Sequence, residues 1–270
     1  MVKQAQTEHE IARARSRRLS RRTWLVRSGT AVLVLVVLAA LWQWIIWWRR
    51  VPVYVVPGPI DVFGGLKDNW QPLVSNMGTT ALEAAAGFAV GTVVACLLAV
   101  SFLYLPPIRA GLMPVAIAVS TVPLVAIAPI LILIFGQGLL SKVVMTSMIC
   151  FFPTLVNLVR GLEAVDQETL DLFHVHNATR LQILAKLRLP TARPYLFAAL
   201  RVTSTAAVIG AIVAEWVNSE RGLGFIIIQE TFNFDAVLLW AAMLMAITLA
   251  TAFFLVVVVL DKLSSRYVVH

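Results

Sequence analysis

Long apolar runs separated by short polar or proline-rich connections dominate the pattern of this chain. A helix needs about 17 to 25 mostly apolar residues to cross the hydrocarbon core of a membrane, and six runs reach that length. We therefore predict an all-α, polytopic membrane protein with six transmembrane helices. The predicted helices cover approximately residues 28–48, 79–103, 108–135, 143–159, 194–216 and 236–260.

A polar and basic stretch, Val165 to Pro190, separates the fourth apolar run from the fifth and is too charged to lie in hydrocarbon. We predict that it folds as a helix in water, because Asp166 offers an N-cap oxygen at its start. Leu170, Phe173 and His174 then follow at the i, i+3, i+4 spacing that gives a helix an apolar stripe. Such a stripe on a polar loop indicates contact with another protein surface.

The second apolar run carries an acid and four small residues at successive i+4 positions: Glu83, Gly87, Gly91, Ala95 and Ala99. Positions four apart lie on one face of a helix, and small side chains let two helix backbones approach closely. We therefore predict that this face packs against another helix. Glu83 is also a candidate for lining a translocation path, since an acid within a membrane span rarely faces lipid.

Prolines interrupt the third apolar run at Pro114, Pro123 and Pro129. Proline lacks a backbone N–H and clashes with the preceding turn, so this run should be kinked or partly unwound. The irregularity has two interpretations, a simple kink or a segment that lines a path, and the sequence leaves both open.

One face of the fifth apolar run brings together Ser204, Ala211 and Glu215. Polar groups on a membrane helix favour contact with protein or with a water-filled path, so these residues join Glu83 as candidates for lining the path. Glu215 has a second interpretation, a structural acid that holds the loop of residues 218–225. The sequence alone does not decide between the two interpretations of Glu215.

Composition agrees with the membrane assignment, since 60% of the residues are hydrophobic, 13% are charged and the mean hydropathy is +0.86. The net charge of +8 is unevenly placed, because residues 1–27 are rich in arginine and precede the first apolar run. Attachment to anionic lipid explains this segment better than nucleic-acid binding. The positive-inside rule then places both termini and the polar stretch in the cytoplasm. The predicted organisation is a basic cytoplasmic segment, residues 1–27, and a transmembrane domain, residues 28–270.

The sequence contains no G-x-x-x-x-G-K-[ST], H-E-x-x-H or G-x-S-x-G motif, so we predict no catalytic residue and no enzyme activity. Cys96 and Cys150 lie within apolar runs, where thiols behave as small hydrophobic groups. His174 and His176 are two apart on a helix and point to different faces. We therefore predict no metal site and no cofactor on this chain.

The polar stretch resembles the cytoplasmic loop of binding-protein-dependent ABC transporter permeases. In that family's pattern, Glu-Ala-Ala is followed after three residues by Gly and, after nine more, by Ile-x-Leu-Pro. The matching positions here are Asp171, Asn177, Leu187 and Leu189-Pro190, with Leu172 and Phe173 in place of the alanines. Asn in place of Gly is a mild change, because Asn tolerates a left-handed turn.

Two further segments are similar to the nitrate, sulfonate and taurine branch of the same family. One runs from Val122-Pro123 to Phe135-Gly136, and the other is Gly-Leu-Gly-Phe at residues 222–225, which follows the acid Glu215. The resemblance implies a transmembrane permease subunit of an ATP-driven importer with a type I permease-like core. It implies a solute that is nitrate-, sulfonate- or taurine-like, or a pyrimidine or aromatic vitamin precursor.

The resemblance also implies partners: a second copy of the permease, two ATPase subunits that bind ATP and Mg, an extracytoplasmic solute-binding protein and membrane lipid, without nucleic acid. The implied location is the bacterial inner membrane. The implied contacts with the ATPase are Leu170, Asp171, Phe173, His174, Asn177, Arg180, Leu189 and Pro190. A stand-alone secondary transporter or channel is the alternative, although such proteins usually show inverted repeats and more spans.

Overall fold

A computed structural model describes residues 29–30, 33–217 and 219–265 of the chain. The predicted basic segment, residues 1–27, therefore lies outside the described residues, as do residues 266–270. The chain divides into two compact units between Gly64 and Gly65. Helix α2 (Pro59–Asp68) contains this division.

The first unit contains an apolar helix from Leu33 to Arg49, the counterpart of the first predicted span. The rings of Trp44 and Trp48 stack with centroids 5.2 Å apart, and the Arg49 guanidinium lies 5.7 Å from the Trp48 ring centroid. Tryptophan and arginine at a helix end are typical of the boundary between hydrocarbon and lipid headgroups.

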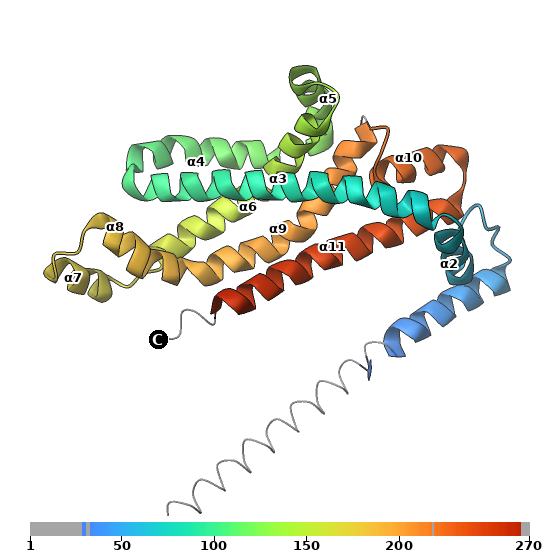
Figure 1. Ribbon diagram of the computed structural model, residues 1–270, viewed down its shortest axis with the longest axis horizontal. Helices are drawn as coiled ribbons and strands as arrows, with labels where there is room; N and C mark the ends of the chain where they lie inside the picture. Colours follow the sequence, from blue (N-terminus) through green and yellow to red (C-terminus); the bar gives the residue numbers. More distant parts are fainter. Residues whose placement is uncertain (1–28, 31–32, 218, 266–270) are drawn as a thin grey trace, which may run out of the picture. The chain divides into compact units, whose positions relative to one another are not determined.

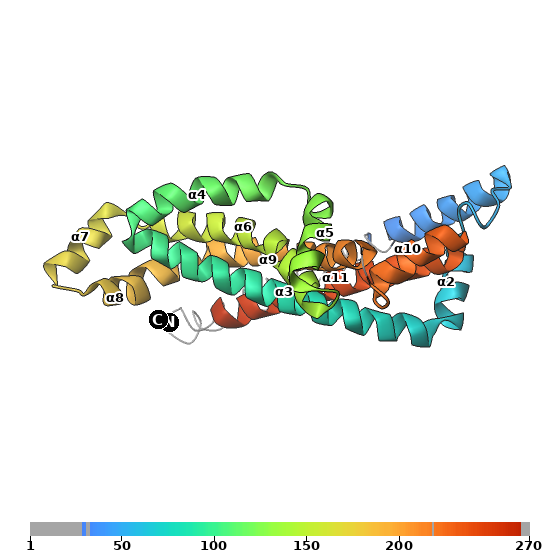
Figure 2. The same cartoon turned by 90° about the horizontal axis from the view of Figure 1, so that it is seen from above.

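The second unit is a helical bundle (Figure 1). Its elements are α3 (Trp70–Tyr104), α4 (Pro106–Thr121), α5 (Leu124–Phe135), α6 (Leu139–Glu163), α7 (Gln167–Val175), α8 (Arg180–Ile183), a π-helical turn (Leu184–Arg188), α9 (Leu189–Val217), α10 (Leu223–Asn233) and α11 (Ala236–Ser265). Helices α3, α6, α9 and α11 lie side by side along the bundle, with α6 packed against both α3 and α9 (Figures 1 and 2). The polar stretch, with α7 and α8, occupies one end, and α10 lies toward the other.

Among the described residues, four helices are long and apolar enough to cross a membrane. These are α3, α6, the continuous helix from Arg180 to Val217, and α11. Helices α4 and α5 reach that length and apolarity when they are taken together, which would make a fifth span. With the shorter helix Leu33–Arg49, they correspond to the six predicted spans.

The third predicted span is broken between α4 and α5, whose axes differ by 106°. The break falls at Val122 and Pro123, both with extended backbone. Pro114 and Pro129 lie inside α4 and α5 and do not interrupt them. The predicted irregularity is confirmed, and only one of the three prolines produces the sharp bend.

The predicted face of small residues on α3 is a close contact with α6, as expected. Glu83, Gly87, Gly91, Ala95 and Ala99 are all buried. A Cβ atom on Gly91 would lie only 2.5 Å from the Ser147 carbonyl oxygen of α6. Because lipid is as apolar as a leucine side chain, membrane helices associate largely through such close packing.

Candidate functional site

The polar segment, which we define as Val165–Pro190, begins with α7. Asp166 precedes α7 with the extended backbone of an N-cap residue (φ −69°, ψ 147°). Its carboxylate accepts a hydrogen bond of 2.5 Å from the Thr169 hydroxyl, and no side-chain bond to a backbone N–H of the first turn is formed. The predicted helix is therefore present, although its acid is bonded to a side chain.

Helix α7 ends in a turn that requires a left-handed residue, and Asn177 supplies it with φ of +53°. The Ala178 N–H donates to the Phe173 carbonyl (3.0 Å) and the Asn177 N–H donates to the His174 carbonyl (2.9 Å). These two bonds make a Schellman motif, and Thr179 then starts α8 with a capping box. The left-handed turn expected at Asn177 is confirmed.

Three large apolar side chains of α7 and α8 are open to solvent, with exposed fractions of 56% for Leu172, 77% for Val175 and 72% for Leu181. We call these three residues the open apolar face. The predicted stripe is different, because Leu170 and Phe173 are only partly exposed. Phe173 lines a cavity of about 290 Å³ together with residues of α8 and the turn before it. Its ring therefore faces the interior of the segment.

The other predicted contact residues are spread along the polar segment. Asp171 and His174 lie on the exposed surface of α7, and the Asp171 carboxylate accepts a hydrogen bond of 3.0 Å from the Gln167 amide. Arg180 is the first residue of α8. Leu189 and Pro190 begin α9, so the segment continues into a membrane span without a break.

Hydrogen bonds tie the polar segment to two long helices that precede it in the chain. The Tyr104 hydroxyl at the end of α3 donates to the Arg180 carbonyl (3.1 Å). The Arg188 guanidinium donates to the Leu162 carbonyl near the end of α6 (2.7 Å). The polar segment is therefore attached to both helices.

A third connection joins the start of α9 to α11. Arg193 and Arg201 both donate to the carboxylate of Asp261, at 3.2 Å and 2.6 Å. Arg193 also donates to the Asp261 carbonyl (2.7 Å). Since α9 continues directly from the polar segment, Asp261 links α11 to that segment through α9.

The interior of the bundle holds an ion pair that joins α3 to α6. The Lys142 ammonium lies 2.7 Å from a carboxylate oxygen of Glu83, and both side chains are largely buried. Lys142 also donates to the Ser219 hydroxyl (2.7 Å), which lies in the loop after α9. Glu83, predicted as a path residue, is thus a partner in a bond between two helices and a loop.

The hydrogen bonds of Glu215 agree with the second of its two interpretations, a structural acid that holds the loop after α9. One carboxylate oxygen accepts from the Thr80 hydroxyl of α3 (2.7 Å), and the other accepts from the Gly224 N–H (2.6 Å). The Thr80 oxygen in turn accepts from the Leu223 N–H (2.8 Å). The acid therefore holds the start of α10, the helix of the Gly-Leu-Gly sequence, against α3 and α9.

The expectation that the face of Ser204, Ala211 and Glu215 borders a path stays a prediction, and within one chain these side chains are buried. Their exposed fractions are 0%, 0% and 1%, and Glu83 is 2% exposed. All four lie against other helices of the same chain, because α9 packs on α3, α6 and α11 with this face inward. Polar groups within a membrane span need contact with protein or water, and here other helices of the same chain provide it.

The sequence reasoning missed Lys142, which was placed outside the membrane beside a predicted span. Helix α6 begins earlier, at Leu139, so this lysine lies within the helix. The signal was available, since Glu83 and Lys142 are opposite charges near the starts of the second and fourth apolar runs, which cross the membrane in the same direction. Charges of this kind in membrane helices usually pair with one another.

This chain is similar to several known proteins. A family model described as "Binding-protein-dependent transport system inner membrane component" matches residues 70–269. A probable ABC transporter permease protein of Haemophilus influenzae is 33% identical over 225 residues, which cover 83% of this chain and 92% of that protein. The riboflavin transport system permease protein RibX of Chloroflexus aurantiacus is 30% identical and covers 94% of each chain.

Other similar proteins are named as permeases for formylaminopyrimidine, aliphatic sulfonates, taurine and nitrate. Among solved structures, the methionine ABC transporter MetNI in inward-facing conformations matches with a TM-score of 0.55 and 20% identity. The match covers 70% of this chain and 93% of that chain, and it shows that the two share a fold.

Proposed function

We propose a working arrangement for this chain from the premise that it belongs to the family of binding-protein-dependent transport system inner membrane components. The chain is a multi-pass permease subunit of an ATP-driven ABC importer, of the nitrate, sulfonate and taurine branch. In such importers the ATPase is a separate chain. Membership in this family decides against the stand-alone transporter that the sequence left open.

The polar segment is the contact with the ATPase in this proposal, and the open apolar face carries the assignment. The open apolar face lies on a segment whose second half is bonded to α3 and α6 through Arg180 and Arg188. An exposed apolar face at the end of a rigidly attached segment suits a partner that moves it. ATP and Mg bind to that partner, and its movement tilts the spans that the segment is bonded to.

The orientation follows from this contact, because an ATPase that uses cellular ATP lies in the cytoplasm. The end of the bundle with α7 and α8 then faces the cytoplasm, and α10 lies toward the outer side. Arg109, Arg188 and Arg193 gather at the inner end, as the positive-inside rule requires. Both termini are cytoplasmic in this arrangement.

The complete importer contains two copies of this permease, two ATPase subunits and an extracytoplasmic binding protein that delivers the solute. A second copy is supported by α4 and α5, which have no buried residue and one buried residue, respectively. The solute is small and belongs among those named for the similar permeases: nitrate, sulfonates, taurine, a pyrimidine or riboflavin.

The contact is tested by replacing Val175 with Asp in the tagged permease and measuring the ATP hydrolysis that co-purifies with it. Val175 is 77% exposed, so the change should leave the permease folded. Burying an unpaired carboxylate in the contact costs about 1 to 3 kcal/mol, which is about 5- to 150-fold in affinity.

Val175→Thr serves as the matched control, because it keeps the branched shape and adds no charge. We expect its co-purifying ATP hydrolysis to stay near that of the unchanged protein. If Val175→Asp also retains full ATP hydrolysis and transport, the open apolar face is not the contact with the ATPase.

A further inference from the structure

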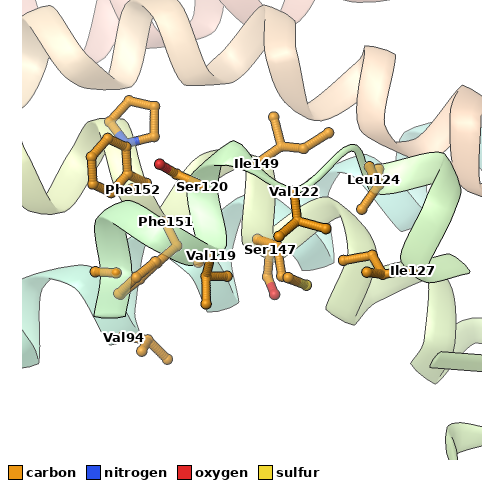
Figure 3. A pocket seen from close by; sticks show the side chains of 14 residues that line it. Val94, Val119, Ser120, Val122, Leu124, Ile127, Ser147, Ile149, Phe151 and Phe152 are labelled. Carbon is orange, nitrogen blue, oxygen red and sulfur yellow. The ribbon is translucent and has the colours of Figure 1, made fainter. Parts of the chain in front are cut away.

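A cavity of about 580 Å³ lies at the break between α4 and α5 (Figure 3). Its walls come from α3, from both sides of the break, and from the middle of α6. Val94 of α3, Val119 and Ser120 of α4, and Ile127 of α5 border it together with a row of α6 residues that begins at Ser147.

The break lies at membrane depth. Helix α4 has 16 residues, which at about 1.5 Å per residue reach only about 24 Å, less than the hydrocarbon thickness of about 30 Å. The cavity also faces Gly91 and Ser147, which lie well inside the long helices α3 and α6. Both observations place it near the middle of the bundle.

Backbone at such a break needs polar partners. The last carbonyls of a helix and the first N–H groups of the next lack partners within either helix. The Ser120 hydroxyl donates to the Ile117 carbonyl, and the Thr121 hydroxyl donates to the Ala118 carbonyl (2.7 Å each). Val122 and Pro123, which follow, are exposed. Lipid chains provide no hydrogen bonds, so the remaining backbone groups need water, a polar solute or another protein surface.

The chemistry of the walls selects the solute. None of the side chains that line the cavity is ionisable, so a nitrate or sulfonate group would lose its water there without gaining a cation. The nearby cation Lys142 is already bonded to Glu83 and Ser219. A cavity whose walls carry no charged side chain favours an uncharged solute.

Two features of the walls fit an aromatic ring that carries N–H groups. Phe151 and Phe152 of α6 offer ring surfaces, against which a planar solute packs favourably. The hydroxyls of Ser120 and Ser147 donate to backbone carbonyls of their own helices, which leaves their oxygen atoms free to accept. Few polar groups in an apolar cavity of this size are typical of small-molecule sites.

We propose that this cavity is a binding site on the translocation path for an uncharged aromatic nitrogen heterocycle of one or two rings. The inference rests on the proposed function as an importer, and it narrows the solute class. The aromatic walls hold the ring, the Ser120 and Ser147 oxygens accept its N–H groups, and the bend between α4 and α5 gives the site its access to water.

The test places single cysteines at positions 120 and 147 in full-length permease whose Cys96 and Cys150 are replaced by alanine. Each variant, in membranes, is treated with a small membrane-impermeant thiol reagent, with uracil, hypoxanthine, nitrate or taurine present at millimolar concentration. Ile247→Cys is the control, because Ile247 is 60% exposed on α11, a helix that contributes no residue to this cavity. The labelling requires neither ATPase nor binding protein, so its outcome is separate from that of the Val175 experiment.

We expect labelling at 120 and 147 and none at 247, with slower labelling in uracil or hypoxanthine and no effect of nitrate or taurine. Absence of labelling at 120 and 147 would show a cavity filled by lipid and overturn the proposal. Protection by nitrate or taurine, or by none of the four solutes, would overturn it as well.

A second pair of variants tests the aromatic wall. Phe152→Ala should raise the uracil concentration for half-maximal protection about 2- to 12-fold, the range expected for loss of one aromatic contact. Phe253→Ala, a partly buried phenylalanine of α11 outside the cavity, should leave that concentration unchanged. Equal effects of the two substitutions would mean that Phe152 acts only through stability and would refute the aromatic contact.

Discussion

The contact between α3 and α6 makes a sharp prediction about two glycines of the same helix. A Cβ atom on Gly91 would lie 2.5 Å from the Ser147 carbonyl oxygen and 3.1 Å from the Cys150 Cβ atom. A Cβ atom on Gly78 would meet nothing within 4 Å. Replacing each glycine by alanine therefore compares a closed position with an open one in one helix.

The magnitude follows from two opposing terms. Alanine stabilises a helix interior by about 0.5 to 1 kcal/mol relative to glycine, and Gly78→Ala should show this gain alone. At Gly91 the ordinary carbon–oxygen contact of about 3.3 to 3.6 Å requires the helices to separate by about 1 Å, because the Ser147 oxygen belongs to the backbone and cannot rotate away. Overpacking of this kind costs about 1 to 3 kcal/mol.

The assay is thermal unfolding of the purified permease in detergent, followed by tryptophan fluorescence. At about 2 to 4 °C per kcal/mol, Gly91→Ala should melt about 2 to 12 °C below Gly78→Ala. Equal melting temperatures for the two variants, or a more stable Gly91→Ala, would refute the reasoning that the small-residue face sets the distance between α3 and α6.

Two further predictions concern the charged contacts. Lys142→Met leaves the Glu83 carboxylate buried without its cation and should destabilise the permease by about 3 to 5 kcal/mol. Adding Glu83→Gln to this variant should recover most of the lost stability. A wild-type melting temperature for Lys142→Met alone would contradict this. Asp261→Asn removes the negative partner of Arg193 and Arg201, so we expect less solute transported per ATP hydrolysed while the ATPase still co-purifies. An unchanged ratio would show that α11 does not follow the polar segment.

Local patterns in the sequence predicted the elements correctly. Apolar length gives membrane helices because no water is present to satisfy backbone groups, and this holds whatever the helix packs against. The small-residue face of α3 and the left-handed Asn177 were predictable for the same reason. Both depend on the shape of a helix or turn and on one side chain at a time.

The features that local patterns did not predict all depend on which neighbour covers a side chain. Phe173 is partly buried and lines a cavity with Gln182 of α8, whereas Val175 is 77% exposed. A helical wheel ranks faces by polarity, but it does not say which neighbour covers each face. The exposed contact surface therefore required the tertiary structure.

Of the three prolines in the third span, only Pro123 lies at the sharp bend. A proline within a helix costs one backbone hydrogen bond, which neighbouring groups can replace, so the residue type alone does not decide where a helix breaks.

The all-helical membrane class and the polar segment follow from hydropathy and periodicity along the chain, and the family was expected from the resemblance of the polar segment to a known motif. Only the tertiary structure decided that Glu83 pairs with Lys142, 59 residues away, and that Glu215 holds the start of α10 through Thr80. The reason is physical: a buried charge must find a partner, but the partner is chosen by the rotation and depth of each helix. Those are set by the close packing of the whole bundle at once.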